Sequence, residues 1–273
     1  MRIVRMGFVM VYICLLRVLS VSGQVPAVGA ESVSMAGISA VLENTWSVVN
    51  NPAGLSRLEQ PAIAMGTEEK FMMKELGQYS LAAVIPVKAG GLGLSAIFSG
   101  YSLSLNQALR LGYGRIFGRH LLAGTSLVYA FSKAGNEGSS IHTLSFSIGT
   151  IVILNDKVVL GFSTYNPFQY YYRSRQYSTL PSVYKIGFVY WYNSSFKLLA
   201  EIDKEIDLPV AIKAGAEYAF GEIFILRAGM GGLPLSYAFG AAARHRQLLF
   251  EIAASSHQYL GFSPCVNIRY TFK

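Results

Sequence analysis

The chain has 273 residues, of which 52% are hydrophobic and 14% charged, and its formal net charge at pH 7 is +8. A soluble domain usually carries about a quarter charged residues, so this composition argues against an ordinary soluble protein. The Lys and Arg residues are spread along the chain without a basic run, which argues against nucleic acid as a partner.

Residues 1–23 have the parts of a secretory signal. Arg2 and Arg5 form a positive n-region, residues 6–16 are apolar, and Val21 and Gly23 precede the expected cleavage site. The apolar stretch is too short to cross a membrane as a helix. We therefore predict a cleaved signal peptide that directs the rest of the chain to export.

Residues 24–60 do not have the pattern of strands. Residues 32–46 place apolar and small residues at helical spacing, which predicts a helix. Pro52 favours a helix start, and Asn51 is a suitable cap before it. We predict a small N-terminal hatch inside a barrel; the alternative is a periplasmic tail packed on the barrel rim. The residues expected at the centre of the hatch are Asn50, Asn51, Pro52, Ala53 and Gly54.

Residues 61–273 repeat short segments in which apolar residues alternate with small or polar ones, as Leu109, Leu111 and Tyr113 do with Arg110. Tight turns and longer loops alternate between these segments, which is typical of an outer-membrane β-barrel. We predict a single antiparallel barrel of about fourteen strands, with about twelve as the alternative. The expected strands are 61–67, 78–86, 90–99, 107–117, 120–131, 141–153, 157–165, 183–193, 196–203, 209–220, 222–230, 235–244, 247–255 and 261–272.

The strand faces that should point into the lumen are rich in Gly, Ala and Ser, with charged residues between them. These are Arg110, Lys185, Lys213, Glu217, Arg227, Glu251 and Arg269. One interpretation is that opposite charges on neighbouring strands pair and stiffen the wall. The other is a polar lining for a ligand path, because small luminal residues leave room for a plug or a narrow passage. The residues expected to face the lumen or a ligand are Met35, Trp46, Arg227 and Arg269.

Residues 165–177 combine five tyrosines with two arginines. Such a loop fits an aromatic belt at the membrane interface, with arginines extending to the headgroups. It also fits a protein-binding surface, because Tyr and Arg are common interface anchors. The residues expected to bind a partner are Tyr170, Tyr171, Tyr172, Arg173 and Arg175.

Little in the sequence indicates catalysis. The four histidines lack metal-ligand spacing with one another or with Cys265, so we expect neither a metal nor a cofactor. His120 and His245 lie in predicted turns beside arginines (Arg119 for the first, Arg244 and Arg246 for the second), where we expect solvated side chains that face phosphates. An outer-membrane lipid hydrolase is therefore only the third functional hypothesis.

Short strings at both ends of the chain resemble a known group. Three parts of the chain resemble the hatch signature of FadL-type fatty-acid transporters: residues 34–37, Trp46 and residues 50–55. These parts are more similar to the PorV/PorQ branch of Bacteroidetes than to other FadL-type proteins. The strings that extend this resemblance to the C-terminal part are 214–218, 226–229, 257–263 and 270–272. The resemblance implies a fourteen-stranded barrel with an N-terminal hatch in a Gram-negative outer membrane, in contact with its lipid.

Two functions follow from the resemblance. The PorV/PorQ branch implies an accessory protein of type IX secretion or outer-membrane protein assembly, which binds a translocon or a secreted cargo protein. The FadL side implies transport of a hydrophobic small molecule. Transport predicts a kinked or bulged strand that opens sideways and an apolar pocket beside the hatch. The residues expected to line that pocket are Met35, Ile38, Leu42 and Trp46. We take the accessory role as the main hypothesis and transport as the alternative.

Overall fold

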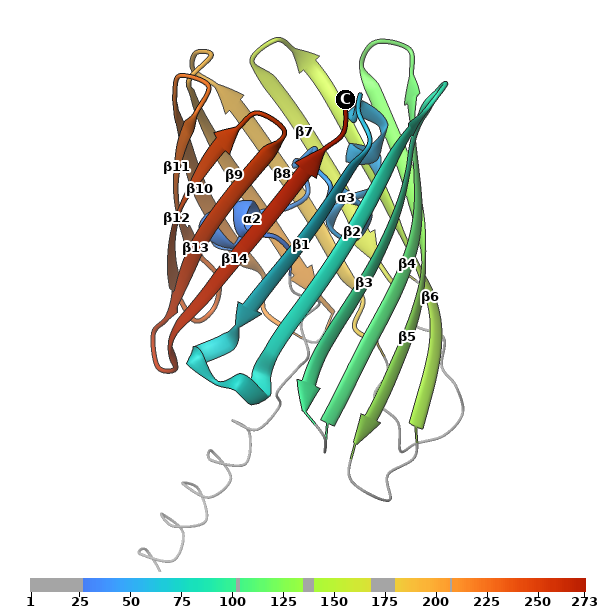
Figure 1. The fold of residues 1–273 in the computed structure, drawn as a ribbon, viewed down its shortest axis with the longest axis vertical. Coiled ribbons are helices and arrows are strands. Elements are labelled where there is room, and N and C mark those ends of the chain that lie inside the picture. Colours follow the sequence, from blue (N-terminus) through green and yellow to red (C-terminus); the bar gives the residue numbers. More distant parts are fainter. Residues whose placement is uncertain (1–26, 102–103, 135–139, 168–179, 207) are drawn as a thin grey trace, which may run out of the picture.

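The computed structural model describes residues 27–101, 104–134, 140–167, 180–206 and 208–273. Fourteen antiparallel strands close into a single barrel, in which each strand pairs with its neighbours in the chain and β1 pairs with β14 (Figure 1). The predicted fold class and the count of fourteen strands are confirmed.

The strands begin and end within a few residues of the predicted bounds. They are β1 (Ala62–Glu69), β2 (Gly77–Val87), β3 (Gly90–Tyr101), β4 (Ser104–Phe117), β5 (Leu121–Ala134), β6 (Ser140–Asn155), β7 (Val158–Tyr165), β8 (Val183–Trp191), β9 (Phe196–Glu205), β10 (Ala211–Phe220), β11 (Phe224–Gly231), β12 (Ser236–His245), β13 (Leu248–His257) and β14 (Gly261–Thr271). Two short 3-10 helices, η3 (Lys70–Met72) and η4 (Lys74–Leu76), lie between β1 and β2.

Side chains alternate between the two faces of the wall with the period of two that β-strands impose. On β4, Leu109 and Leu111 are 50% and 56% exposed, whereas Arg110 between them is 4% exposed. Apolar residues cover the outer face all round the barrel, as contact with lipid requires. None of the helices in the described ranges has the length and apolar character needed to cross a bilayer.

The two ends of the barrel differ. The tight turns, such as the one between β12 and β13, lie at the end that carries the C-terminus, and the longer connections lie at the other end (Figure 1). We call these the turn end and the loop end. In outer-membrane barrels the short turns face the periplasm. Exposed aromatic residues near the turn end include Phe117, Tyr218, Phe220, Phe224, Tyr270 and Phe272.

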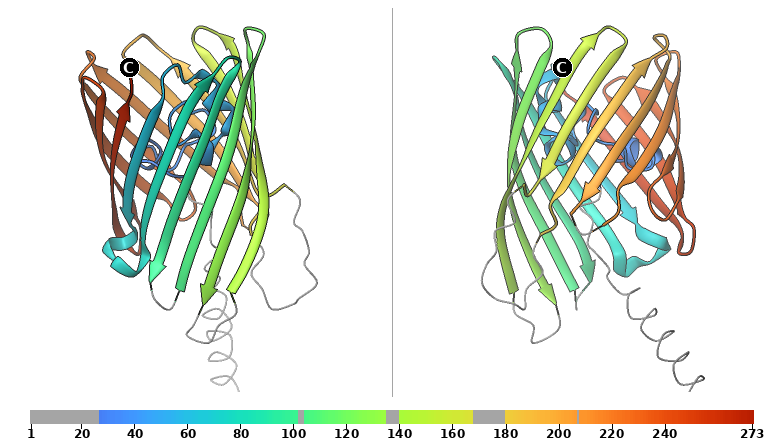
Figure 2. Two further views of the ribbon diagram at one scale, coloured as in Figure 1. Left: turned by 45° about the vertical axis from the view of Figure 1, so that its right-hand side comes forward. Right: turned by 180° about the vertical axis from the view of Figure 1, so that it is seen from behind.

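Residues 27–60, which we call the luminal segment, lie inside the barrel (Figures 1 and 2). The segment contains α2 (Ala30–Ser34), α3 (Ser47–Asn50) and η2 (Pro52–Arg57). The prediction of a helix over residues 32–46 is wrong. The helix ends early because Ala36 and Gly37 adopt left-handed conformations with φ of 55° and 83°, which redirect the chain.

Candidate functional site: the filled lumen

Glycines of the barrel wall make room for the luminal segment. A Cβ atom at Gly124 of β5 would overlap the backbone of Pro52, and one at Gly149 of β6 would overlap the Asn51 amide. The luminal glycines with such close approaches are Gly91, Gly93, Gly112, Gly114, Gly124, Gly149, Gly161, Gly187, Gly215, Gly229 and Gly240. Because these inward-facing residues are small, the luminal segment packs in close contact with the wall.

Asn51 joins the segment to itself and to the wall. Its Oδ1 accepts a hydrogen bond from Ala53 N at 3.1 Å and so caps η2. Its Nδ2 donates to Ala40 O within the segment, and faces Phe162 O of β7 at 3.3 Å. The Asn51 side chain is fully buried, so these bonds replace the water that a buried amide loses.

The other expected hatch residues lie beside Asn51. Asn50 holds the start of the described segment through two bonds: Val28 N to Asn50 Oδ1 at 2.9 Å, and Asn50 Nδ2 to Val28 O at 2.8 Å. Pro52 begins η2, and Ala53 packs in a buried cluster of the wall. Gly54 has no room for a Cβ, because Leu42 O occupies that space.

A first cluster of charges fixes the middle of the segment to β8, β9 and β10. Glu201 Oε2 accepts hydrogen bonds from the backbone amides of Ser39 at 2.8 Å and Ala40 at 2.6 Å. Lys185 Nζ donates to Ser39 Oγ at 2.8 Å. Lys213 Nζ pairs with Asp203 at 2.6 Å and lies 3.6 Å from Glu201.

A second cluster centres on Arg227, one of the expected luminal residues. Its guanidinium pairs with Glu217 of the neighbouring strand β10 at 2.6 Å, and with Glu251 of β13, two strands away, at 2.7 Å. Glu31 of α2 lies 3.9 Å from Arg227 and 3.8 Å from Lys197. The charges therefore pair across strands, as the first interpretation expects, and they also bind the luminal segment.

Glu31 remains ionised inside the barrel. Burial raises the pKa of its carboxyl, but the nearby charges of Arg227 and Lys197 and a hydrogen bond from Asn44 outweigh burial and lower the pKa to about 2. Asn44 Nδ2 donates to Glu31 Oε2 at 2.8 Å. The attraction between α2 and the wall therefore persists at neutral pH.

A third contact lies at the loop-end side of α3. Arg110 of β4 donates to Val49 O at 3.1 Å, and its guanidinium lies 5.1 Å from the ring centroid of Tyr165. The cation is buried, so the backbone carbonyl and the aromatic face replace part of its hydration. Tyr165 is the last residue of β7, as the expected strand 157–165 has it.

Met35 and Trp46 are packed side chains. Met35 is fully buried in a cluster with Ile38, Leu42 and others. The indole of Trp46 packs against the first strands, and its Nε1 donates to Asn267 at 2.8 Å when the amide oxygen of Asn267 faces it. In this structure Met35, Ile38, Leu42 and Trp46 are buried in packed clusters, and an apolar pocket lined by them stays a prediction.

The remaining predicted site residues fall elsewhere. Arg269 points into the lumen at the turn end, in the same register row as Leu249. Tyr170, Tyr171, Tyr172, Arg173 and Arg175 lie outside the described residues. In the described ranges, no group of three His, Cys, Asp or Glu side chains is arranged to hold a metal.

Sequence reasoning missed Glu31, Lys197, Glu201 and Asp203. Three of these lie on β9 at odd-numbered positions, and that period of two was the available signal for a charged inward face. Glu31 had no such signal, because a single acid in an irregular segment says nothing about its partner.

A chamber of about 290 Å³ lies on the loop-end side of the luminal segment. Its floor includes Val33 and Ala36 of the segment, and its rim includes Pro209 and Leu233. Lys185, Asp203 and Lys213 line one wall, where Asp203 is paired with Lys213. The chamber is therefore lined by apolar groups and by charges that largely compensate one another.

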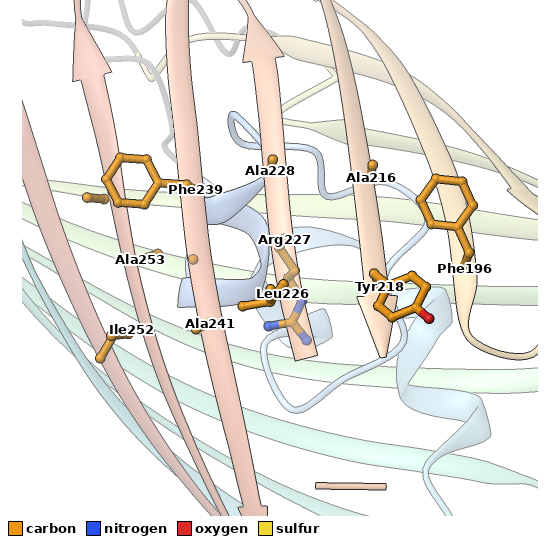
Figure 3. A pocket seen from close by; sticks show the side chains of 12 residues that line it. Phe196, Ala216, Tyr218, Leu226, Arg227, Ala228, Phe239, Ala241, Ile252 and Ala253 are labelled. Atoms are coloured by element: carbon orange, nitrogen blue, oxygen red, sulfur yellow. The ribbon is translucent and has the colours of Figure 1, made fainter. Parts of the chain in front are cut away.

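An apolar hollow of about 570 Å³ lies on the lipid-facing wall over β9 to β13 (Figure 3). Alanines form its floor, and the larger side chains of Tyr218, Leu226 and Phe239 surround it. Arg227 extends from the same wall toward the barrel interior (Figure 3). Along this stretch the β10–β11 and β11–β12 ladders are continuous, so the hollow does not open into the lumen.

The wall shows no lateral opening in the described residues. Among the described strand pairs, the only register shift is between Ile153 and Asn155, beside the tight turn that joins β6 to β7. The kinked or bulged strand expected for lateral release is therefore not seen in this conformation.

No family model matches the chain, and no curated protein matches it. Solved structures do. A Pseudomonas aeruginosa FadL homologue aligns with a TM-score of 0.70 at 11% identity, over 91% of this chain and 99% of that one. The Ralstonia pickettii toluene transporter TbuX gives 0.72 at 10% identity, over 92% and 100%. The Pseudomonas putida toluene transporter TodX gives 0.68 at 13% identity, over 91% and 99%.

The chain therefore has the fold of FadL-type outer-membrane barrels. The comparisons support the FadL-like part of the sequence resemblance and lend no support to the PorV/PorQ branch.

Proposed function

We propose that this protein is an outer-membrane barrel that carries small hydrophobic compounds across the membrane. The observation that carries the proposal is the filled lumen: a separate segment of the same chain, held by bonds and ion pairs, closes the barrel below a chamber that faces the loop end. The shared fold with two toluene transporters supports the same function.

The chamber suits a small neutral solute. Its volume of about 290 Å³ exceeds that of a cavity of about 150 Å³ known to bind benzene in another protein. Three cations line the chamber (Lys70, Lys185 and Lys213) together with three carboxylates (Glu68, Asp203 and Glu205), so the formal charges balance and little net charge is left to attract an ion. Val33, Ala36 and Leu233 offer apolar contact.

The location follows from the barrel surface. The apolar outer face requires lipid, and the signal-like residues 1–23 favour export. With the short turns in the periplasm, the chamber opens to the outside of the cell, so a solute reaches it before it meets the luminal segment.

The accessory role in type IX secretion is the weaker candidate. It rests on the sequence resemblance, and the residues expected to grip a partner, 170–175, lie outside the described ranges. No described contact surface favours a translocon or cargo protein over a small solute.

Uptake of radiolabelled toluene by cells with the protein, compared with cells carrying an empty vector, tests transport directly. A second test asks whether the luminal segment must move. Ala30 and the native Cys265 belong to one buried cluster, so Ala30→Cys adds a second thiol to the cluster that holds Cys265. Oxidation should join the segment to β14, and we expect uptake to fall and to recover after reduction.

Ala30→Ser is the matched control, since it cannot form the bond. Loss of free thiol, measured by alkylation, shows whether the lock has formed. Uptake no faster than with the empty vector would overturn transport. Full uptake by the locked protein would instead show that solute passes without displacement of this part of the segment.

A further inference from the structure

A basic groove of about 640 Å³ lies at the turn end of the barrel, away from the chamber. Arg244, Arg246, Arg269 and Lys273 line it, and no acidic residue does. In the described ranges none of these four cations lies within ion-pair distance of a carboxylate, although the charge of Arg269 helps to lower the pKa of Glu31 in α2. The luminal charges described above are mostly paired, so this excess of positive charge is a separate feature.

The sheet register holds two of the arginines in a fixed relation. Arg244 of β12, Leu249 of β13 and Arg269 of β14 stand directly opposite one another, so their side chains share one face. Neighbouring strands lie about 4.8 Å apart, which places the two arginine stems about 10 Å apart on either side of buried Leu249. Long guanidinium side chains at this spacing can converge on one anion.

Arg246 occupies a backbone position that favours glycine. It is the first residue after β12 and has a left-handed φ of 54°. At the equivalent positions after β4 and β10 the chain has Gly118 and Gly221, with φ of 65° and 61°. An arginine at such a position carries a conformational cost, which points to a use for its side chain.

The groove adjoins the lipid-facing surface. Leu248 lines the groove and is 47% exposed on the outer wall, opposite Tyr270 in the ladder. Tyr270 and Phe272 stack edge to face at 4.9 Å and are exposed on that wall. Aromatic residues of this kind mark the boundary between acyl chains and headgroups. The groove therefore crosses the rim at headgroup level, from the luminal face that carries Arg244 and Arg269 to the apolar outer wall at Leu248.

We infer that this groove binds the phosphate of an anionic phospholipid. The phosphate would lie at the rim beside Arg246 of the turn, where Arg244 and Arg269 reach it from the luminal face, and the acyl chains would lie along Leu248 and Tyr270 on the outer wall. A ligand with an anionic head and apolar chains matches both halves of the surface, whereas an acidic peptide would match only the basic half. Such a lipid would fix the turn end of β12 to β14 at the periplasmic face, independently of any solute carried.

Native mass spectrometry of the purified full chain tests the site. The probes are phosphatidylglycerol and phosphatidylcholine with identical acyl chains. We expect one phosphatidylglycerol to be retained about ten-fold more tightly than phosphatidylcholine, and we expect Arg244→Gln with Arg246→Gln to abolish the difference. The matched control is Lys88→Gln with Arg119→Gln, which removes two exposed cations from other tight turns and should leave the preference intact.

Arg246→Gly separates binding from folding. Glycine suits the left-handed turn, so this variant should unfold at a higher temperature than wild type and yet retain less phosphatidylglycerol. Equal retention of both lipids by wild type would overturn the proposal, and so would an equal loss in the Lys88 and Arg119 control. Displacement of the lipid by inorganic phosphate at matched concentration would also overturn it, because the site would then bind a free ion.

Discussion

At the scale of single residues, Asn51 shows how one amide joins the luminal segment to the wall. Its oxygen accepts a hydrogen bond from Ala53 N. Its nitrogen donates to Ala40 O and faces the carbonyl oxygen of Phe162. Both ends of the amide are used, so no other side chain of similar size satisfies the same partners.

Asn51→Asp should therefore destabilise the protein. The substitution keeps the cap on η2, but it replaces the donor with a carboxylate oxygen that faces backbone carbonyls in a buried site. We expect a loss of about 1–3 kcal/mol in the free energy of unfolding, measured by urea denaturation in detergent.

Asn193→Asp is the matched control. Asn193 lies in an exposed turn and uses only its oxygen, which accepts from Ser195 N at 2.9 Å and Phe196 N at 2.8 Å. A carboxylate does the same, so its stability should stay near wild type. If both variants lost the same stability, the donor of Asn51 would have no special role.

At the scale of elements, the luminal segment packs closely against the wall because the wall residues that it meets are glycines, which have no side chain. Helix η2 lies against glycines of β3, β4, β5 and β6, while the end of α2 and the two residues after it lie against glycines of β12 and β11. The fit allows backbone to meet backbone, so that even one added methyl group must displace the segment.

Gly124→Ala tests this fit. The new methyl group would overlap the backbone of Pro52, and we expect a cost of about 1–3 kcal/mol together with displacement of the segment. Cys265 reports displacement, because it is buried against Ala30 and Val33 of the segment. Its alkylation by a maleimide should become faster in the variant.

Leu127→Ala provides the comparison on the same strand. Leu127 is 52% exposed on the outer face, where it does not touch the segment, so alkylation of Cys265 should remain slow. An unchanged alkylation rate in Gly124→Ala would mean that the wall yields instead of the segment.

At the scale of the whole molecule, the wall and the luminal segment play separate parts. The strand ladders close the barrel without help from the segment. Arg227 pairs with Glu217 and Glu251, and Lys213 with Asp203, all within the wall. The segment adds bonds to Glu201 and Arg110 and fills the interior.

Deletion of residues 27–57 should therefore leave a barrel that folds but conducts ions. We expect lower thermal stability, because Glu201 and Arg110 lose their buried partners. We also expect steady conductance in a planar bilayer, where the intact protein shows little, since a barrel of about fourteen strands has space for a channel once its plug is removed. A deleted form that folds but stays closed would show that the wall side chains alone seal the lumen.

The strands, their count and the faces of the wall followed from the sequence. Each depends on local chemistry: a period of two places Leu109 in lipid and Arg110 in the lumen, and short polar turns end the strands. The start of η2 at Pro52, with Asn51 as its cap, was predictable for the same reason. The predicted helix over 32–46 failed, because contacts with the wall outweigh helical spacing in so short a segment.

Which charges meet was decided only by the tertiary structure. Glu31 and Arg227, or Ser39 and Glu201, are far apart in the chain, and their pairing depends on how the closed barrel positions the luminal segment. The same holds for the packing of Met35 and Trp46 and for the basic groove, which gathers arginines from a turn and two strands. The local sequence pattern determines whether a side chain faces lipid or the lumen. Closure of the barrel around the luminal segment determines which residue that side chain contacts.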